Sequence, residues 1–438
     1  MKPKHIKQLL ISSIKQVSAK KQKYALQPNV NFTRRRKLPL ESMLTEIIKL
    51  ESKSLSNEII DMFNTADINI TASAFVQQRQ KIKPEAFSDI FAAFNQRISA
   101  HFPETIRILA VDGSDIHVPT DEHDKDSFIK KTNGQKPYNL LHLNALYDLN
   151  NKIYVDTVLQ KCFKQDECSA LCKMVDASTI KKALVIADRG YESFNNLAHI
   201  QEKNWFFLFR IRDGYQGMKS GLVLPETDEF DISFELNITR KQTNDVKTLL
   251  KNKNSYRFIP SNCRFDYLPQ KSRKADSTLF YKLKFRLVRF KISENLYETI
   301  ITNLNKNDYS PSKLKELYAF RWGIETSFRD LKYTLGMLNF HTKKMMCIYQ
   351  EIYAHLIMYN FVATITSHVA VVIKQRKHKY KVNFSVAVHI CRAFLKGNAS
   401  SSEVETVIAK YLIPLRLGRL YPRDIMPRRH TDFSYRVS

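Results

Sequence analysis

Side chains that can bind phosphate or metal ions recur along one stretch of the chain. Tyr318, Arg321, Glu325 and Lys332 follow the spacing Tyr-x2-Arg-x3-Glu-x6-Lys. At about 100° per residue, these four side chains fall within roughly 60° of one another on a helix, so one stripe carries an acid, two bases and a phenol. A purely structural helix would place apolar residues on its buried stripe. The alternative interpretation is an exposed face with i,i+4 charge pairs, which is a common arrangement.

Two aspartates, Asp112 and Asp188, each follow a short apolar run that predicts a core strand. Strand ends are where an α/β layer exposes residues to a cleft. If these carboxylates and Glu325 face one another, they repel unless divalent cations neutralise them, and oxygen-only ligands suit Mg²⁺ or Mn²⁺. Two such ions, roughly 3.5–4 Å apart, can activate a nucleophilic oxygen and stabilise the leaving oxygen of a phosphodiester. Each acid alone is weak evidence, because Asp after a strand often caps a turn, and Asp115 has the same explanation.

The charge of the chain predicts a polyanionic partner. Among 438 residues there are 70 Lys and Arg against 43 Asp and Glu, a net charge of +27. Nucleic acid is the leading candidate and an acidic membrane surface is second. The hydrophobic content of 43% excludes wholesale disorder, and the length is enough for two or three domains.

The N-terminal region is strongly basic. Residues 1–37 hold eleven Lys or Arg and no acid, and they end in the run Arg34, Arg35, Arg36 and Lys37, which is suited to neutralising phosphates. The alternative is a merely solvated arm.

Residues 40–100 show helical periodicity. Thr71 or Ser73 could cap a short helix whose polar face, including Gln78 and Arg79, offers amides and bases to DNA. Plain helical packing is the alternative. We therefore expect residues 1–104 to form a helical, basic DNA-binding region.

From residue 105 the pattern changes to short apolar runs typical of strands. We expect strands at 106–111, 140–147, 153–159, 183–187, 205–211 and 296–304, with a helix at 166–176. Three antiparallel strands, a helix and then a parallel strand make a mixed α/β layer. Residues 236–291 hold fifteen Lys or Arg against three acids, so we interpret about 213–294 as a basic β-rich insertion in a catalytic domain spanning 105–375.

The C-terminal part is predicted to be helical. The apolar stretch Leu356–Ile373 raises the question of a membrane span, but Asn360 and Thr364 interrupt it, which favours a buried core helix and no membrane association. Helices near 384–395 and 402–412 and an Arg-rich tail complete a region at 376–438.

Cysteine usage and the N-terminus favour a cytoplasmic protein. The six cysteines form no Cys-x-x-Cys pair, so we interpret them as reduced thiols. A zinc site from Cys162, Cys168 and Cys172 is the alternative, although the spacing fits no standard site. No apolar segment typical of a secretory signal is evident.

Taken together, the motifs resemble a known signature. Asp112 in Val-Asp-Gly-Ser-Asp, Asp188 in Ala-Asp-Arg-Gly-Tyr and the Tyr-Arg-Glu-Lys spacing resemble the DDE-type bacterial insertion-sequence transposases of the insertion-sequence-four group. The motifs are specific together and weak singly, and the resemblance covers most of the chain. It implies an α/β fold with a ribonuclease-H-like catalytic core, a β-rich insertion, and helical N- and C-terminal regions.

The same resemblance implies a function. It implies cut-and-paste transposition: two Mg²⁺ ions assist cleavage at transposon ends, and the freed 3′-hydroxyls attack target DNA. A homodimer on DNA and association with the bacterial nucleoid are also expected. The metal ligands would be Asp112, Asp188 and Glu325. The DNA-binding residues would be Tyr318, Arg321, Lys332, Arg189, Arg210, Tyr297 and the basic run Arg34, Arg35, Arg36 and Lys37.

The chain departs from the resemblance at one point. Related enzymes that cut through a DNA hairpin hold a flipped base on an aromatic residue, often Trp, in the insertion. The two tryptophans here, Trp205 and Trp322, do not lie near the end of that segment, so Tyr297 is the candidate substitute and the hairpin route is in doubt. Two other functions remain open: a DNA-binding protein without catalysis, such as a domesticated or decayed copy, and a ribonuclease-H-like nuclease that cuts without joining.

Overall fold

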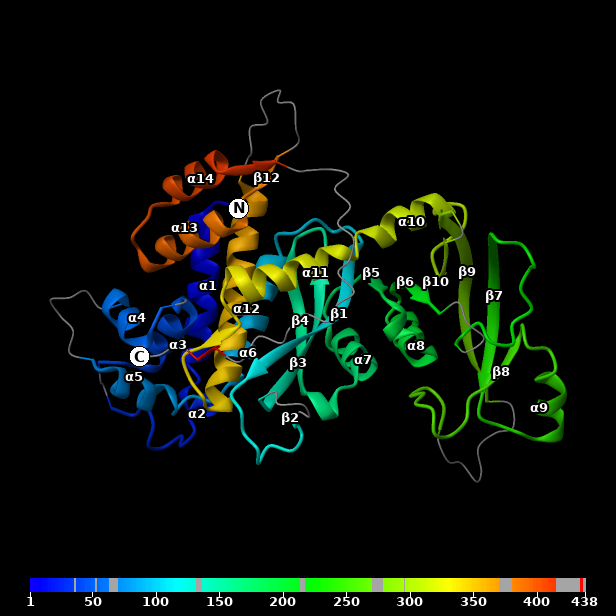
Figure 1. The fold of residues 1–438 in the computed structure, drawn as a ribbon, viewed down its shortest axis with the longest axis horizontal. Helices are drawn as coiled ribbons and strands as arrows, with labels where there is room; N and C mark the ends of the chain where they lie inside the picture. The colour runs from blue at the N-terminus through cyan, green and yellow to red at the C-terminus, as the bar shows by residue number, and fades with distance from the viewer. Residues whose placement is uncertain are drawn as a thin grey trace.

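The computed structural model shows a mixed α/β protein built around one large sheet (Figure 1). The residues that it describes are 1–34, 37–51, 53–62, 70–130, 136–212, 217–269, 279–294, 296–369, 380–414 and 434–435. Helices from both ends of the chain gather on one side of the molecule in Figure 1, and the segment containing β7–β9 lies on the other. Arg35, Arg36 and the Arg-rich tail lie outside the described residues.

The strands of the large sheet are β1 Arg107–Val118, β2 Phe128–Ile129, β3 Tyr138–Asp148, β4 Ile153–Lys161, β5 Ala183–Ala187, β6 Phe206–Ile211, β7 Phe230–Thr239, β8 Tyr256–Phe258, β9 Tyr281–Ser293 and β10 Leu296–Thr302. Their order is β2-β3-β1-β5-β6-β10-β9-β7-β8, and β4 pairs with β3. Strand β1 runs antiparallel to β3 and parallel to β5, which confirms the predicted mixed arrangement. The remaining short strands are β11 Asn339–Phe340, β12 Tyr380–Val382, β13 Leu412–Pro414 and β14 Ser434–Tyr435.

One strand prediction was wrong at its end. The sequence predicted a first core strand at 106–111, because the apolar run ends before Asp112. Strand β1 instead continues to Val118, and Asp112 pairs with Ala145 in its middle. The neighbouring strand β3 is buried along nearly all of its length, and β1 continues to pair with it beyond Asp112. The polar residues of Asp-Gly-Ser-Asp therefore lie within the paired part of β1.

The helices are α1 Pro3–Ser18, α2 Lys21–Tyr24, α3 Leu40–Lys49, α4 Leu55–Met62, α5 Ala72–Arg79, α6 Glu85–Ser99, α7 Glu167–Ala177, α8 Phe194–Glu202, α9 Asn244–Leu249, α10 Pro311–Ala319, α11 Trp322–Arg329, α12 Met345–His368, α13 Phe384–Lys396 and α14 Ser401–Lys410. Short 3-10 turns lie at Cys162–Lys164 and Arg189–Tyr191, and a π-helical turn lies at Asp330–Thr334.

The sheet lies between two layers of helices. One apolar cluster joins α1, α3, α6 and α12–α14 to β1, β3 and β4, so both ends of the chain share a core with the sheet. On the opposite face α7 and α8 pack against β1, β5 and β6. In a third apolar cluster, α10 packs on β5, β6 and β10. This arrangement packs α10 on β5, which Asp188 directly follows, and α11 on β1, which carries Asp112.

The DNA-facing interpretation of α5 was wrong for Gln78 and Arg79. Thr71 does cap α5, accepting a hydrogen bond from the backbone of Ala74 at 3.1 Å. Gln78 and Arg79 are buried, however. Arg79 Nη1 lies 2.7 Å from Glu351 Oε1 on α12, so its charge is used within the core rather than on DNA.

Helix α12 is the buried core helix that the sequence favoured. Seventeen of its residues are buried, including Asn360 and Thr364. Asn360 satisfies its amide by accepting from the Tyr154 N–H at 2.8 Å and donating to the Tyr154 carbonyl at 2.7 Å. Within the part of the chain that the structure describes, no helix is long and apolar enough to cross a membrane. The six cysteines are free thiols, as expected.

The basic segment between β6 and β10 extends the same sheet through β7, β8 and β9 and adds the short helix α9. Lys282 and Lys284 of β9 are exposed, and both pair with Glu235. Arg286 is buried and donates to Asp231 at 2.7 Å, so part of the basic character is structural.

Candidate active site

The stretch with Tyr-Arg-Glu-Lys spacing forms two helices rather than one. Ser310 caps α10 and Pro311 occupies its first turn, where its missing N–H would have had no partner in the helix. Helix α10 ends at Ala319, and the backbone N–H groups of Arg321 and Gly323 then bond to carbonyls three residues earlier, at 3.0 and 2.9 Å. A tightened turn of the 3-10 type therefore separates α10 from α11.

Arg321 joins two of the candidate carboxylates. Its Nη2 lies 2.9 Å from Glu325 Oε1, and its Nη1 lies 3.9 Å from Asp112 Oδ2 on β1. The arginine is only 6% exposed. The interpretation of this stripe as an exposed helix face is therefore wrong, even though Arg321 and Glu325 are an i,i+4 pair.

Asp188, the third candidate carboxylate, is contacted by Tyr318 from α10 and by Arg210 from β6. It directly follows β5 and accepts a hydrogen bond from the Arg189 backbone N–H at 2.7 Å. The Tyr318 hydroxyl donates to Asp188 Oδ1 at 3.5 Å, and Arg210 Nη1 lies 4.0 Å from the same oxygen. Tyr318 lies in turn beside Arg321, whose guanidinium carbon is 6.0 Å from the ring centre. The three carboxylates thus surround one arginine and one tyrosine.

The protonation of Asp112 reflects this crowding. Burial is the main cause that raises its pKa to about 6; Glu325 and Glu167 add to the rise, and Arg321 opposes it. A buried carboxylate with acidic neighbours gains most from a bound cation, and all-oxygen donors suit Mg²⁺. The donor chemistry of Asp112, Asp188 and Glu325 therefore fits a divalent ion. Among the described residues, however, no group of three or more His, Cys, Asp and Glu side chains has the arrangement of a metal site, which also leaves the zinc alternative unsupported.

Lys332 reaches the same region from the π-helical turn after α11. Its Nζ donates to the backbone carbonyl of Asp115 in β1, 217 residues earlier in the chain, at 2.6 Å. Burial lowers the pKa of Lys332, and Asp115 partly opposes this effect. The π-turn, in which the Leu335 N–H bonds to the Asp330 carbonyl at 3.0 Å, sets the direction of this side chain.

The other predicted DNA-binding residues are spread more widely. Arg189 is exposed next to Asp188, and Arg210 Nη1 also lies 3.4 Å from Glu298. Tyr297 donates to Asp228 at 3.3 Å, and Arg289 covers its ring. In the basic run, Arg34 and Lys37 are exposed.

The two tryptophans have different environments. Trp205 is 1% exposed and cannot stack on a base, whereas Trp322 is 51% exposed at the start of α11. The Arg321 guanidinium carbon lies 5.0 Å from the centre of the Trp322 ring.

Two titratable residues beside Asp112 were missed by the sequence analysis. His142 on β3 and Glu167 at the start of α7 form an ion pair with 3.0 Å between Nε2 and Oε1. Neither belongs to a recognisable motif. The one sequence signal was Gly113, directly after Asp112, because glycine within a strand often marks a close approach of other groups.

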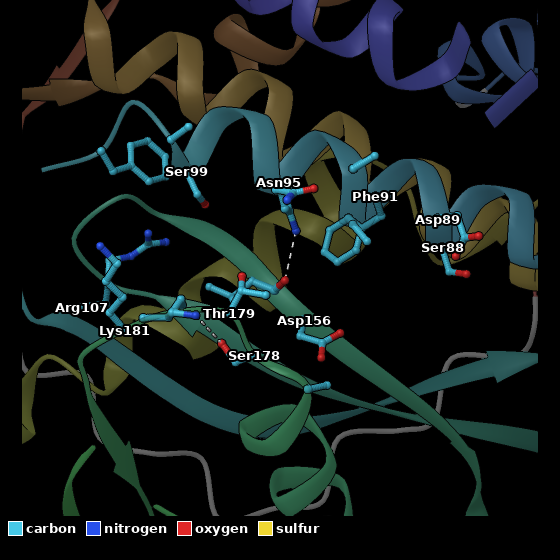
Figure 2. Close-up of a pocket in the computed structure, with 18 of the residues that line it drawn as sticks. Ser88, Asp89, Phe91, Asn95, Ser99, Arg107, Asp156, Ser178, Thr179 and Lys181 are labelled. Carbon is cyan, nitrogen blue, oxygen red and sulfur yellow. Dashed lines mark hydrogen bonds between the residues drawn. The ribbon is translucent and has the colours of Figure 1, made fainter. Parts of the chain in front are cut away.

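A groove elsewhere on the molecule has a volume of about 1370 Å³. Figure 2 shows it between Asn95 and Ser99 on one side and Asp156, Thr179 and Lys181 on the other. Burial raises the pKa of Asp156 to about 6. None of the three candidate catalytic carboxylates lines this groove, so it is separate from the site described above.

The chain is similar in sequence to known transposases. Residues 103–361 match the family model described as a transposase DDE domain. The transposase InsG for insertion sequence element IS4 from Escherichia coli (strain K12) is 22% identical over 344 residues, which cover 75% of this chain and 70% of that protein. A piggyBac transposase in a synaptic complex with hairpin DNA aligns over 94% of this chain and 82% of that chain, with 10% identity and a TM-score of 0.46. Because the family model matches more than half of the sequence, this chain belongs to the family of transposases with a DDE domain, of the kind encoded by IS4-type insertion sequences.

Proposed function

We propose that this chain is an active cut-and-paste transposase. It binds the ends of an insertion sequence, cleaves phosphodiester bonds with two divalent metal ions and transfers the 3′-hydroxyl ends to target DNA. The observation that carries this proposal is the meeting of Arg321 and Tyr318 with carboxylates from β1, β5 and α11. A ribonuclease-H-like arrangement of the core, interrupted between β6 and β10, is part of the same proposal.

Asp112, Asp188 and Glu325 would hold the cations. Bound Mg²⁺ supplies activation of the attacking oxygen and stabilisation of the leaving oxygen. The protein's own contribution is to fix the carboxylates on a strand, at the end of a second strand and on a helix, so that they need little reorganisation before reaction.

The cationic side chains around the carboxylates would bind and orient the DNA. Arg321, Lys332 and Arg210 now contact carboxylate or carbonyl oxygens of the protein, and phosphate oxygens can take the place of those acceptors. Tyr318 can donate its hydroxyl proton to a phosphate oxygen in the same way. Arg189 and the basic run at 34–37 would neutralise flanking phosphates, and Tyr297 would contact DNA from β10.

The partner would be double-stranded DNA, both transposon ends and target, with a homodimer forming on it. The net charge of +27 supports a polyanionic partner. The proposed chemistry does not require a hairpin intermediate, and Trp205 is too buried to hold a flipped base.

A cleavage and strand-transfer assay tests this function. The substrate is a duplex carrying the inverted repeats that flank the gene, incubated in Mg²⁺ with a target plasmid, beside a gel-shift measurement. We expect Glu325→Gln to abolish cleavage and to keep end binding, because the substitution preserves size and removes one charge of the metal site. Glu316→Gln is the matched control: it changes an exposed acid on α10 and should cleave normally.

The same assay separates the alternatives. A wild-type protein that binds the ends without cutting is a DNA-binding copy, and one that cuts without joining is a nuclease. Full cleavage by the Glu325→Gln protein would rule out the proposed site, whatever its binding did.

A further inference from the structure

His142 bridges two acidic side chains next to the candidate active site. Its Nδ1 lies 2.7 Å from Asp115 Oδ1 and its Nε2 lies 3.0 Å from Glu167 Oε1. Burial alone lowers the pKa of His142, but the hydrogen bonds to Asp115 and Glu167 outweigh it and raise the pKa to about 9. At neutral pH both ring nitrogens therefore carry protons and donate, one to β1 and one to α7.

The Glu167 carboxylate lies between the backbone segments that follow both aspartates. A Cβ atom added to Gly113 would stand 2.8 Å from Glu167 Oε1 and 2.2 Å from His142 Nε2. A Cβ atom added to Gly190 would stand 3.6 Å from Glu167 Oε2. Gly113 directly follows Asp112, and Gly190 is the second residue after Asp188. The imidazole and the carboxylate thus fill the space between β1 and the turn after β5.

Glu167 also brings a negative charge close to Asp112, because its Oε1 lies beside Gly113, the residue that directly follows Asp112. It is fixed at the first turn of α7, where Asp166 caps the helix by accepting from the Ser169 N–H at 2.8 Å. A fixed negative charge beside a metal-binding carboxylate strengthens the local attraction for a divalent cation.

We propose that His142 and Glu167 are positioning residues of the catalytic centre. The imidazole, anchored by Asp115, fixes the Glu167 carboxylate between Gly113 and Gly190, and this bridge sets the spacing and the negative potential of Asp112 and Asp188. The inference rests on the proposed function, since it takes Asp112 and Asp188 as the cation ligands. It adds residues that lie outside the Asp-Asp-Glu set.

The test compares His142→Ala, Glu167→Gln and the double variant. Two quantities are measured: Mn²⁺ binding to the DNA-free protein by calorimetry, and the Mg²⁺ concentration for half-maximal cleavage. Groups that orient metal ligands contribute about 10- to 100-fold to metal affinity, so we expect each single variant to weaken Mn²⁺ binding and to raise the Mg²⁺ midpoint by that factor. If His142 acts through Glu167, the double variant is no worse than the more affected single variant.

His199→Ala is the matched control. His199 forms the same kind of bridge at the other end of α7, with its ring nitrogens 2.9 Å from Asp176 and 2.9 Å from Asp266. Its loss should lower thermal stability and leave the Mn²⁺ affinity and the Mg²⁺ midpoint unchanged. Should His142→Ala fail to fold, Glu167→Gln, which preserves size, carries the test alone.

Wild-type metal dependence in both single variants, with only a stability loss like that of the control, would overturn the proposal. The binding measurement does not require cleavage. If wild-type protein fails to cut end DNA while Glu167→Gln still weakens Mn²⁺ binding, the proposed function is wrong. The positioning role of His142 and Glu167 at the metal site is then supported. If Glu325→Gln abolishes cleavage while Glu167→Gln leaves the metal dependence unchanged, only the positioning role of His142 and Glu167 is wrong. A wild-type protein that binds no Mn²⁺ overturns both.

Discussion

The Nη2 atom of Arg321 lies 2.9 Å from Oε1 of Glu325, one helical turn further along the chain. The same guanidinium approaches Asp112 from β1, so one buried cation neutralises two candidate metal ligands while the protein is free of DNA. Binding of DNA or metal must therefore change what this arginine contacts.

Replacing Arg321 should show whether its guanidinium neutralises Asp112 and Glu325. In Arg321→Ala the two partly buried carboxylates lose their cation, and we expect the free energy of unfolding without metal to fall by about 1–3 kcal/mol, as for polar groups left without a partner. Added Mg²⁺ should raise the melting temperature more in this variant than in wild type, because it replaces the lost charge. Arg329→Ala, at an exposed position of α11, is the control in a thermal-shift titration. Equal Mg²⁺ shifts in all three proteins would contradict this expectation.

Lys332 should affect the reaction without affecting metal binding. Its Nζ contacts a backbone carbonyl rather than a carboxylate, so Lys332→Ala leaves the acidic side chains in place. We expect cleavage at saturating Mg²⁺ to fall about 10- to 100-fold through poorer positioning of the DNA, with unchanged Mn²⁺ affinity. Lys315→Ala removes a similar contact, to the Lys291 carbonyl at 3.0 Å, and serves as the control. A Lys332→Ala protein with normal cleavage would show that this lysine is structural.

The basic run at 34–37 should set part of the salt dependence of DNA binding. Each neutralised phosphate contributes about 0.9 to the slope of log affinity against log salt concentration. Replacing Arg34, Arg35, Arg36 and Lys37 by Gln should therefore reduce the slope by up to about 3–4, measured by fluorescence anisotropy on end DNA. The double variant of Lys181 and Lys182, two exposed residues that line the separate groove, is the comparison. An unchanged slope in the fourfold variant would mean that the run does not touch DNA.

The buried pair of Arg79 and Glu351 should stabilise the helical layer. Leaving Arg79 unpaired in Glu351→Ala should cost about 3–5 kcal/mol in urea unfolding at neutral pH. Glu405→Gln, an exposed change on α14, should stay within about 0.5 kcal/mol. A loss as small as that of the control would show that the pair contributes little.

The same pair predicts a pH dependence. Burial alone raises the pKa of Glu351, but Arg79 and His341 outweigh it and hold the pKa at about 2. Because this value lies below the ordinary 4.5, the contribution of Glu351 to stability is present above pH 4.5 and is lost as the pH falls toward 2. The stability difference between wild type and Glu351→Gln should therefore shrink over that range. A difference that stays constant with pH would contradict the assignment.

Local patterns in the sequence were reliable where one segment alone decides the outcome. The apolar run before Asp188 ends in a strand because five consecutive buried residues need both faces covered, and Asp188 then begins a turn. Ser310 and Pro311 start α10 because the cap and the missing N–H act within one turn. The polar interruptions of α12 also predicted its burial correctly, since a core helix tolerates amides that find partners.

Partners distant in sequence decided the rest. Arg79 is a core residue because Glu351, 272 residues later, neutralises it, and no helical pattern reveals such a pair. Strand β1 runs past Asp112 because β3 supplies a continuous ladder.

The sequence by itself determined which residue types could do the chemistry and that they belong to one family of transposases, since motif spacing and charge are properties of the chain alone. Only the tertiary structure placed Arg321 between Asp112 and Glu325, and Glu167 between Gly113 and Gly190. Those contacts depend on how α7, α10 and α11 pack on the sheet, and packing is set by all the apolar surfaces at once rather than by any single motif.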